Sequence, residues 1–185
     1  MRKLEAVICY LLDTYPHKRD MVDYRLTKTV YLIDWVSCKR HDKQITKTMW
    51  LFDRRGPYVD DILIESLRSK NIKAIYLDNP SNPYFTFIGD SDEVLKALTE
   101  EEISVIDFVI KHTKALYTMN FEYLVDSTHP FFHGTEKQIV DLRKISRDHS
   151  VEEGDEGFLK DCSAGESKEE GPKGVVGRII QKLLN

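Results

Sequence analysis

Cysteine is scarce in this 185-residue sequence, and Cys9, Cys38 and Cys162 lie far apart. An odd number of cysteines at wide spacings argues against a disulfide framework and a zinc site, so we expect reduced thiols. Long apolar runs are also missing, since none approaches the roughly 18 residues that span a bilayer. Glu5 places an acid where a signal peptide needs apolar residues. These absences predict a cytoplasmic protein with no membrane partner.

The sequence has no excess of positive charge, because its formal net charge is −4 at pH 7. It therefore has no overall attraction for nucleic acid. One local cluster of basic residues surrounds Trp50 and Phe52 and comprises Lys39, Arg40, Lys43, Lys47, Arg54 and Arg55. Because Asp42 and Asp53 interrupt this cluster, a solvated face with local ion pairs is favoured over a nucleic-acid groove.

Motifs that mark common enzymes are missing as well. The sequence has no glycine-rich phosphate loop, no nucleophile elbow, no kinase motif set and no Cys-x-x-Cys. His129 and His133 have the spacing of two metal ligands on a helix, but Pro130 lies between them. We therefore predict a protein that is not an enzyme and that uses no metal or cofactor. A hydrolase based on aspartate or histidine is a minor alternative.

Glycine and acidic residues are concentrated near the C-terminus. Residues 150–174 hold five of the nine glycines and eight acids against three lysines. Such a segment cannot bury enough apolar surface to offset the entropy of ordering it, so we interpret it as a flexible acidic linker. The preceding residues, 1–149, are expected to form a single folded domain.

Beyond the linker, residues 175–185 carry apolar side chains at helical spacing, among them Ile179, Ile180 and Leu183. They predict a short amphipathic helix, which is marginal alone in water and needs a surface to dock on. Three surfaces remain open: the folded domain of the same chain, a groove on a partner protein, or a membrane surface.

Apolar periodicity and turn signals predict that the folded domain is α+β, mainly helical, with a small β-hairpin and short strands. The expected elements are helices at 3–14, 24–38, 58–69, 121–127 and 136–147, a long helix after a capping box formed by Thr99 and Glu102, a strand at 45–52, and a hairpin of 74–77 with 84–88. The helix at 24–38, with Asp23 as its cap, has so few polar positions that it should cross the centre. Pro57 suits the first turn of the helix that follows it.

An ordered set of motifs is more distinctive than these patterns. It begins with Lys28-x-x-Tyr31-Leu32-Ile33-Asp34-Trp35 and continues through Gln44-Ile45-Thr46, Trp50 and Gly56-Pro57-Tyr58-Val59-Asp60-Asp61-Ile62. A second block follows as Leu98-Thr99-Glu100-Glu101-Glu102, Ile106-Asp107-Phe108-Val109-Ile110 and Phe121-x-x-Leu124-Val125-x-Ser127-Thr128. Over roughly residues 24 to 147, this order resembles the Panacea domain, the SocA-like antitoxin domain.

The resemblance implies an antitoxin-like protein of bacteria or their phages, which binds a protein partner, a toxin, and neutralises it by direct contact. The candidate motif or partner-binding residues are Lys28, Tyr31, Asp34, Trp50, Gly56, Pro57 and Tyr58, together with Ile179, Ile180 and Leu183 of the C-terminal helix. The large rings among them suit interface anchors, although Tyr31 and Trp50 also suit a core. We expect Lys28 and Asp34 to form a buried polar pair that orients the Gly56-Pro57 turn.

A DNA-binding regulator with a winged-helix-like body, in which the hairpin is the wing, is the alternative function. The segment after Pro57 is acidic, where a recognition helix needs basic and amide side chains. Nucleic acid is therefore a poorer candidate than a protein partner. The sequence makes no prediction of the oligomeric state.

Overall fold

The computed structural model describes residues 1–53, 56–77, 82–128 and 138–151. The elements in chain order are α1 (Lys3–Thr14), η1 (Lys18–Asp20), α2 (Asp23–His41), β1 (Trp50–Asp53), β2 (Gly56–Tyr58), α3 (Asp60–Arg68), β3 (Ile72–Ile75), β4 (Tyr84–Phe87), α4 (Ser91–Ala97), α5 (Glu100–Thr113), α6 (Thr118–Asp126), β5 (Ile139–Val140) and α8 (Leu142–Val151). The prediction of a mainly helical α+β fold is confirmed. The linker at 150–174, apart from the end of α8, and the helix at 175–185 lie outside the described residues.

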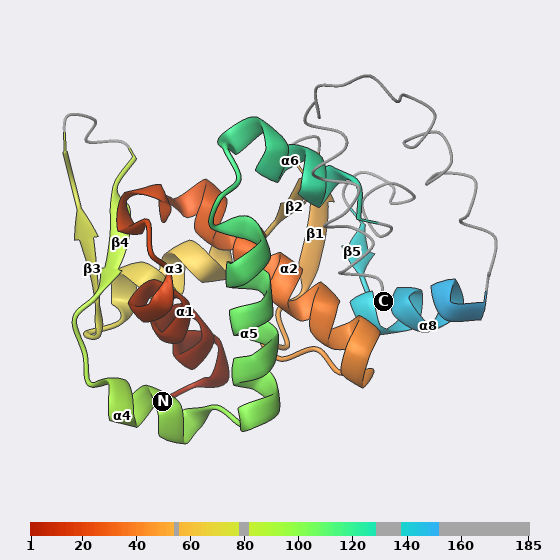
Figure 1. The fold of residues 1–185 in the computed structure, drawn as a ribbon, viewed down its shortest axis with the longest axis horizontal. Coiled ribbons are helices and arrows are strands. Elements are labelled where there is room, and N and C mark those ends of the chain that lie inside the picture. Colours follow the sequence, from red (N-terminus) through yellow and green to blue (C-terminus); the bar gives the residue numbers. More distant parts are fainter. Residues whose placement is uncertain (54–55, 78–81, 129–137, 152–185) are drawn as a thin grey trace.

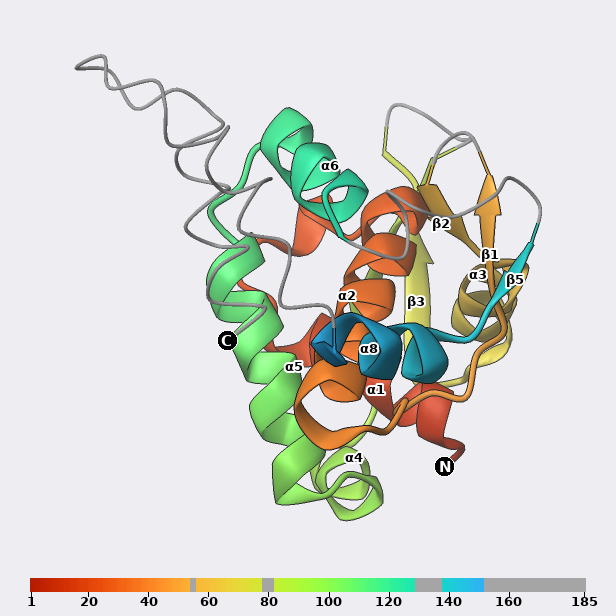
Figure 2. The ribbon, with the colours of Figure 1, turned by 90° about the vertical axis from the view of Figure 1, so that its right-hand side faces the viewer.

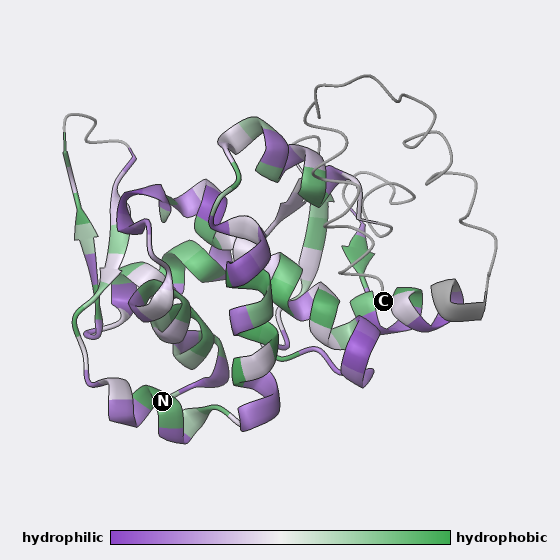
Figure 3. Cartoon of the chain, viewed as in Figure 1, coloured by the Kyte–Doolittle hydropathy of each residue, from purple (hydrophilic) through white to green (hydrophobic). Residues whose placement is uncertain are grey.

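Helix α2 is the central element, as its lack of polar positions predicted. Every residue from Arg25 to Cys38 is buried, and α2 packs against α1, α3, α5, α8 and β2. It lies between α5 and the sheet that contains β1 (Figures 1 and 2). Hydrophobic stretches of α1, α2 and α5 meet in the interior (Figure 3). The core therefore forms around a single buried helix.

The start of α2 differs by one residue from the prediction. Val22, and not Asp23, is the N-cap residue. Val22 forms an isolated bridge with Tyr84, which holds it in an extended conformation. Asp23 is the first helical residue and accepts a hydrogen bond from the hydroxyl of Thr27. A contact with a distant strand therefore sets this boundary.

The strands form two small antiparallel sheets. The predicted hairpin is confirmed as β3 paired with β4. A second sheet has the order β2-β1-β5. Of its three strands, the sequence predicted only β1. Of the strand predicted at 45–52, only residues 50–52 lie in a strand, because β1 begins at Trp50. Pro57 lies in β2, paired with Phe52, instead of in a helix. The predicted helix at 136–147 likewise gives way to β5, and α8 begins only at Leu142.

Side chains cap the N-termini of α4 and α5. Thr99 and Glu102 form the predicted capping box, in which the Thr99 hydroxyl accepts from the Glu102 amide and the Glu102 carboxylate accepts from the Thr99 amide. Asp90 caps α4 by accepting from the amide of Asp92.

Among the described residues, no helix has both the length and the apolarity to cross a membrane.

Candidate functional site

Three polar residues of the motif follow one another along α2. Lys28, Tyr31 and Asp34 are spaced three residues apart, so they lie on the same side of the helix. All three are buried, with at most 3% of each residue exposed. This side of α2 faces the loop before β1, the β1–β2 ribbon and the end of α6, and each of the three side chains contacts a different part of these segments.

Asp34 holds the loop that leads into β1. Its Oδ1 atom accepts hydrogen bonds from the backbone amides of Ile45 (3.0 Å) and Thr46 (2.9 Å). Its Oδ2 atom accepts from the indole Nε1 of Trp50 (3.0 Å) and from the Thr46 hydroxyl. Burial raises the pKa of the Asp34 carboxyl from 3.8 to about 6, although these hydrogen bonds act in the opposite direction.

The raised pKa of Asp34 gives a pH dependence with a definite sign. The proton-linked part of its contribution to the free energy of unfolding is fully present below about pH 4 and declines as the pH rises through about 6, because the folded state holds the proton more tightly. The hydrogen bonds that the ionised carboxylate accepts are a separate contribution, which remains at pH 7. The loss amounts to about 3 kcal/mol, at about 1.4 kcal/mol per pKa unit. We expect the NMR resonance of the Trp50 Nε1–H group to titrate with a midpoint near pH 6. Trp35, the second tryptophan, is the internal control. A Trp50 midpoint below pH 4.5 would contradict this assignment.

Tyr31 joins α6 to the sheet through the interior. Its hydroxyl lies 2.7 Å from Oγ1 of Thr128. Its ring packs edge-on against Trp50 and Phe52, with centroid distances of 5.5 and 6.2 Å. Tyr31 and Trp50 are both 0% exposed. These two rings are therefore part of the core, and of the three aromatic candidates only Tyr58 is exposed.

Lys28 lies beneath the turn at Gly56 and not beside Asp34. Gly56 has φ +97°, and a Cβ atom there would lie 2.6 Å from Lys28 Nζ and 3.6 Å from Oδ1 of Asp126. Glycine therefore satisfies both the left-handed backbone and the close approach of the ammonium group. Lys28 Nζ is also 4.5 Å from the centroid of the Tyr24 ring, and its charge lowers the pKa of Asp126, which burial raises more strongly. The expected pair of Lys28 with Asp34 is thus replaced by two separate contacts.

The opposite face of the β2-β1-β5 sheet is apolar and exposed. Side chains from 47 to 52 alternate between the exterior and the core, so Met49 and Leu51 point outward while Trp50 and Phe52 point inward. Leu51 is directly opposite Tyr58 on β2 and Ile139 on β5. We call Met49, Leu51, Tyr58 and Ile139 the outer sheet face, and their exposed fractions are 68, 37, 44 and 65%.

Sequence reasoning identified only Tyr58 of this outer sheet face. The alternation at 45–52 placed Met49 and Leu51 on one side, but it did not indicate whether that side was buried or exposed. Ile139 carried no signal, because it lay inside a predicted helix.

Two residues of the basic cluster, Lys43 and Arg40, and the acid that interrupts it, Asp42, have partners within the protein. Asp42 binds Arg143 and Arg147 of α8, and hydrogen bonds from these two guanidinium groups hold the pKa of Asp42 well below its usual range. Lys43 lies 3.8 Å from Glu102, while Arg40 packs on the ring of Phe108 at 3.6 Å. These contacts agree with a solvated face with local ion pairs. Arg54 and Arg55 lie outside the described residues.

No group of three or more metal-ligating side chains occurs in the part of the chain that the structure describes. His129 and His133 fall outside that part. The same holds for the C-terminal candidates Ile179, Ile180 and Leu183. Their roles stay predictions.

Comparison with known protein families identifies a match. Residues 26–133 match the family described as antitoxin SocA-like, Panacea domain. This range covers more than half of the chain and includes α2 from Leu26 onward, the β1–β2 ribbon and α6. The resemblance found in the sequence motifs is therefore confirmed. Neither curated proteins nor solved structures gave a match.

Proposed function

We propose that this chain, which belongs to the SocA-like Panacea antitoxin family, binds a toxin or another defence-related protein and neutralises it by direct contact. The family supports an antitoxin-like role, and the partner and the act of neutralisation are our proposal. We also propose that the protein acts by binding and not by catalysis.

The outer sheet face is the observation that carries this proposal. Met49, Leu51, Tyr58 and Ile139 bring four large side chains to neighbouring positions on a single face. Contiguous exposed apolar patches on a folded domain mark interaction sites. Tyrosine and methionine are enriched in protein interfaces, where large rings fill partner pockets. The face therefore suits a protein partner with a complementary apolar pocket.

The buried motif supports this role by making the face rigid. Asp34 fixes the loop before β1 through hydrogen bonds, Tyr31 packs beneath β1, and Lys28 lies against the Gly56 turn before Tyr58. A surface that is ordered before binding loses less entropy on association. The motif residues would thus act indirectly, by holding the β1–β2 ribbon in the shape that the partner recognises.

The C-terminal helix is proposed as a second contact. Ile179, Ile180 and Leu183 have the spacing of a helix that lies in an apolar groove. Helix α8 continues to Val151, two residues beyond the predicted end of the folded domain, so a truncation that tests the tail should retain it.

The test is a capture experiment with the tagged full chain beside a truncation that ends at Val151. We expect a stoichiometric partner whose complex survives high salt, because an apolar interface depends little on ionic strength. The captured protein expressed alone should stop growth, and co-expression with this chain should restore it. Loss of the partner on truncation would assign recognition to the C-terminal helix. A chain that returns alone and binds DNA with steep salt dependence would overturn the proposal and favour the regulator.

A further inference from the structure

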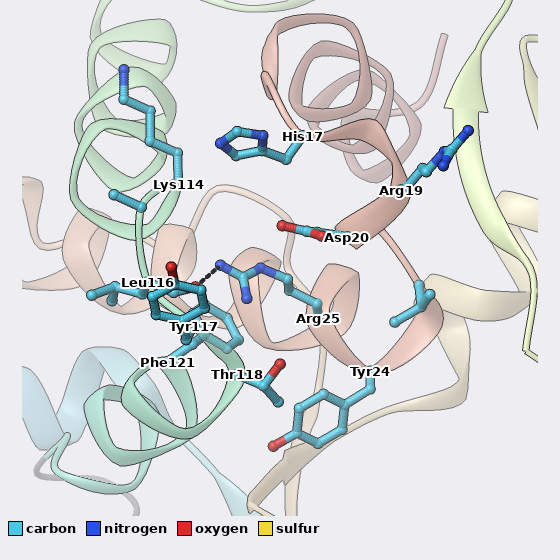
Figure 4. Close-up of a pocket in the computed structure, with 12 residues that line it drawn as sticks. His17, Arg19, Asp20, Tyr24, Arg25, Lys114, Leu116, Tyr117, Thr118 and Phe121 are labelled. Atoms are coloured by element: carbon cyan, nitrogen blue, oxygen red, sulfur yellow. Dashed lines mark hydrogen bonds between the residues drawn. The ribbon is translucent and has the colours of Figure 1, made fainter. Parts of the chain in front are cut away.

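A pocket of about 550 Å³ lies where η1 and the start of α2 meet the turn between α5 and α6. It includes no residue of the outer sheet face, and Figure 4 shows the side chains that line it. The β2-β1-β5 sheet lies on the other side of α2 from α5 (Figure 1). Its lining comes from His17 to Arg25 on one side and from Lys114 to Phe121 on the other. Pockets of this volume hold small organic molecules.

The floor of the pocket contains a buried guanidinium group. Arg25 is only 6% exposed, and its Nη2 atom donates to the Tyr15 hydroxyl (3.0 Å) and to the carbonyl oxygens of Thr113 and Leu116 (2.9 Å each). Its Cζ atom lies 4.4 Å from the centroid of the Phe121 ring. These contacts fix the guanidinium group in place, and Figure 4 shows it directed toward Tyr117 and Leu116.

One nitrogen of this group has no acceptor in the part of the protein that the structure describes. The hydrogen bonds of Arg25 use Nε and Nη2, and among the described residues Nη1 has no acceptor. A buried charged donor without a partner is costly, so such groups are normally satisfied by protein, water or ligand. Nη1 is therefore a ready donor to an anionic oxygen inside the pocket.

The N-terminus of α6 supplies a second set of donors at the same place. Thr118, the first residue of this nine-residue helix, lines the pocket. Its N-cap, Tyr117, makes no side-chain capping hydrogen bond. The first amides of a helix have no intrahelical acceptor, and the helix dipole makes this end positive. An oxyanion would thus find both charge and directed N–H groups.

The remaining lining residues narrow the ligand class. Tyr117 is 84% exposed and offers a free ring face at the rim. Lys114 adds a cation at the rim, and Asp20 points toward Arg25 (Figure 4). Arg19 also lines the pocket, but its guanidinium group is directed away from Arg25, so the Asp20 carboxylate offsets part of the positive charge that a ligand would meet. The lining therefore favours one phosphate group attached to a planar ring over a polyphosphate.

We infer that this pocket binds a phosphate monoester of about mononucleotide size, with its phosphate on Arg25 and the α6 N-terminus and its ring on Tyr117. This site is independent of the proposed neutralisation of a partner. It depends on the juxtaposition of a buried arginine of α2 with an exposed ring and an uncapped helix end, which are neighbours in the chain at the start of α6.

The test is a titration of the full chain with AMP, adenosine and inorganic phosphate, followed by NMR amide shifts and calorimetry. We expect AMP to bind at least tenfold more tightly than either fragment and to shift the amides of Thr118 and its neighbours. Tyr117→Ala and Lys114→Glu should each weaken AMP binding at least fivefold. Lys111→Glu, an exposed lysine on α5 outside the pocket, is the matched control.

Three results would overturn the inference. The first is the absence of Thr118 amide shifts at 10 mM AMP. The second is equal affinity for AMP and adenosine, since the phosphate would then not be recognised. The third is an equal loss of affinity in Lys114→Glu and Lys111→Glu, which would indicate general electrostatic attraction. Thermal unfolding of each variant separates loss of the site from loss of the fold.

Discussion

Replacing Asp34 with alanine should lower the free energy of unfolding by at least about 3 kcal/mol, a large part of the roughly 5–15 kcal/mol that stabilises a domain. The carboxylate accepts from the amides of Ile45 and Thr46, from the Thr46 hydroxyl and from the Trp50 indole. Asp34 is 0% exposed. Alanine would leave these donors without an acceptor where water does not replace it, and each orphaned donor costs about 1–3 kcal/mol.

Urea unfolding at pH 7 and a thermal scan measure this loss, which should appear as a fall in Tm of roughly 6–12 °C. Asp42→Ala is the matched control, because Asp42 also binds several donors but 44% of its side chain is exposed, so water replaces the lost contacts and the cost should be far smaller than for Asp34→Ala. The loss of stability in Asp34→Asn should lie between the losses in Asp34→Ala and Asp42→Ala, since an amide oxygen still accepts from two of the donors. Equal losses for Asp34→Ala and Asp42→Ala would show that Asp34 does not hold the loop.

Two charges on the outer sheet face should abolish partner binding without unfolding the protein. In the double variant Met49→Glu with Ile139→Glu, both positions are about two-thirds exposed, so the cost to stability should stay within about 1 kcal/mol. In a complex the same carboxylates would be buried without partners, which is strongly unfavourable. We expect the affinity for the captured protein to fall at least 100-fold.

The control for this variant changes exposed apolar residues elsewhere. Leu77→Glu with Ile88→Glu alters two positions that are 56 and 57% exposed and lie next to the β3–β4 hairpin. This variant should retain full affinity in calorimetry or surface plasmon resonance. If both double variants bind normally, the outer sheet face is not the partner site. If only the truncation after Val151 loses the partner, recognition belongs to the C-terminal helix.

Local sequence patterns determined much of the framework. The periodicity of α1 and the apolar length of α2 predicted both helices to within a few residues, and Thr99 and Glu102 predicted the start of α5. These features depend on residues that are neighbours in the chain, where helical spacing and capping operate. The motif order also identified the family, because it is a property of the sequence alone.

Tertiary structure decided which of these residues face a partner and which form the core. An alternating segment such as 47–52 has two faces, and only the packing of α2 behind it buries Trp50 and exposes Leu51. The pairing of β1 with β5 joins segments almost 90 residues apart, so local periodicity at 136–147 could not reveal it. Likewise, Lys28 and Asp34 share one side of α2, but chain segments that arrive from elsewhere gave them different partners. Short-range patterns specify elements and their amphipathic faces, whereas burial and pairing depend on contacts between distant segments.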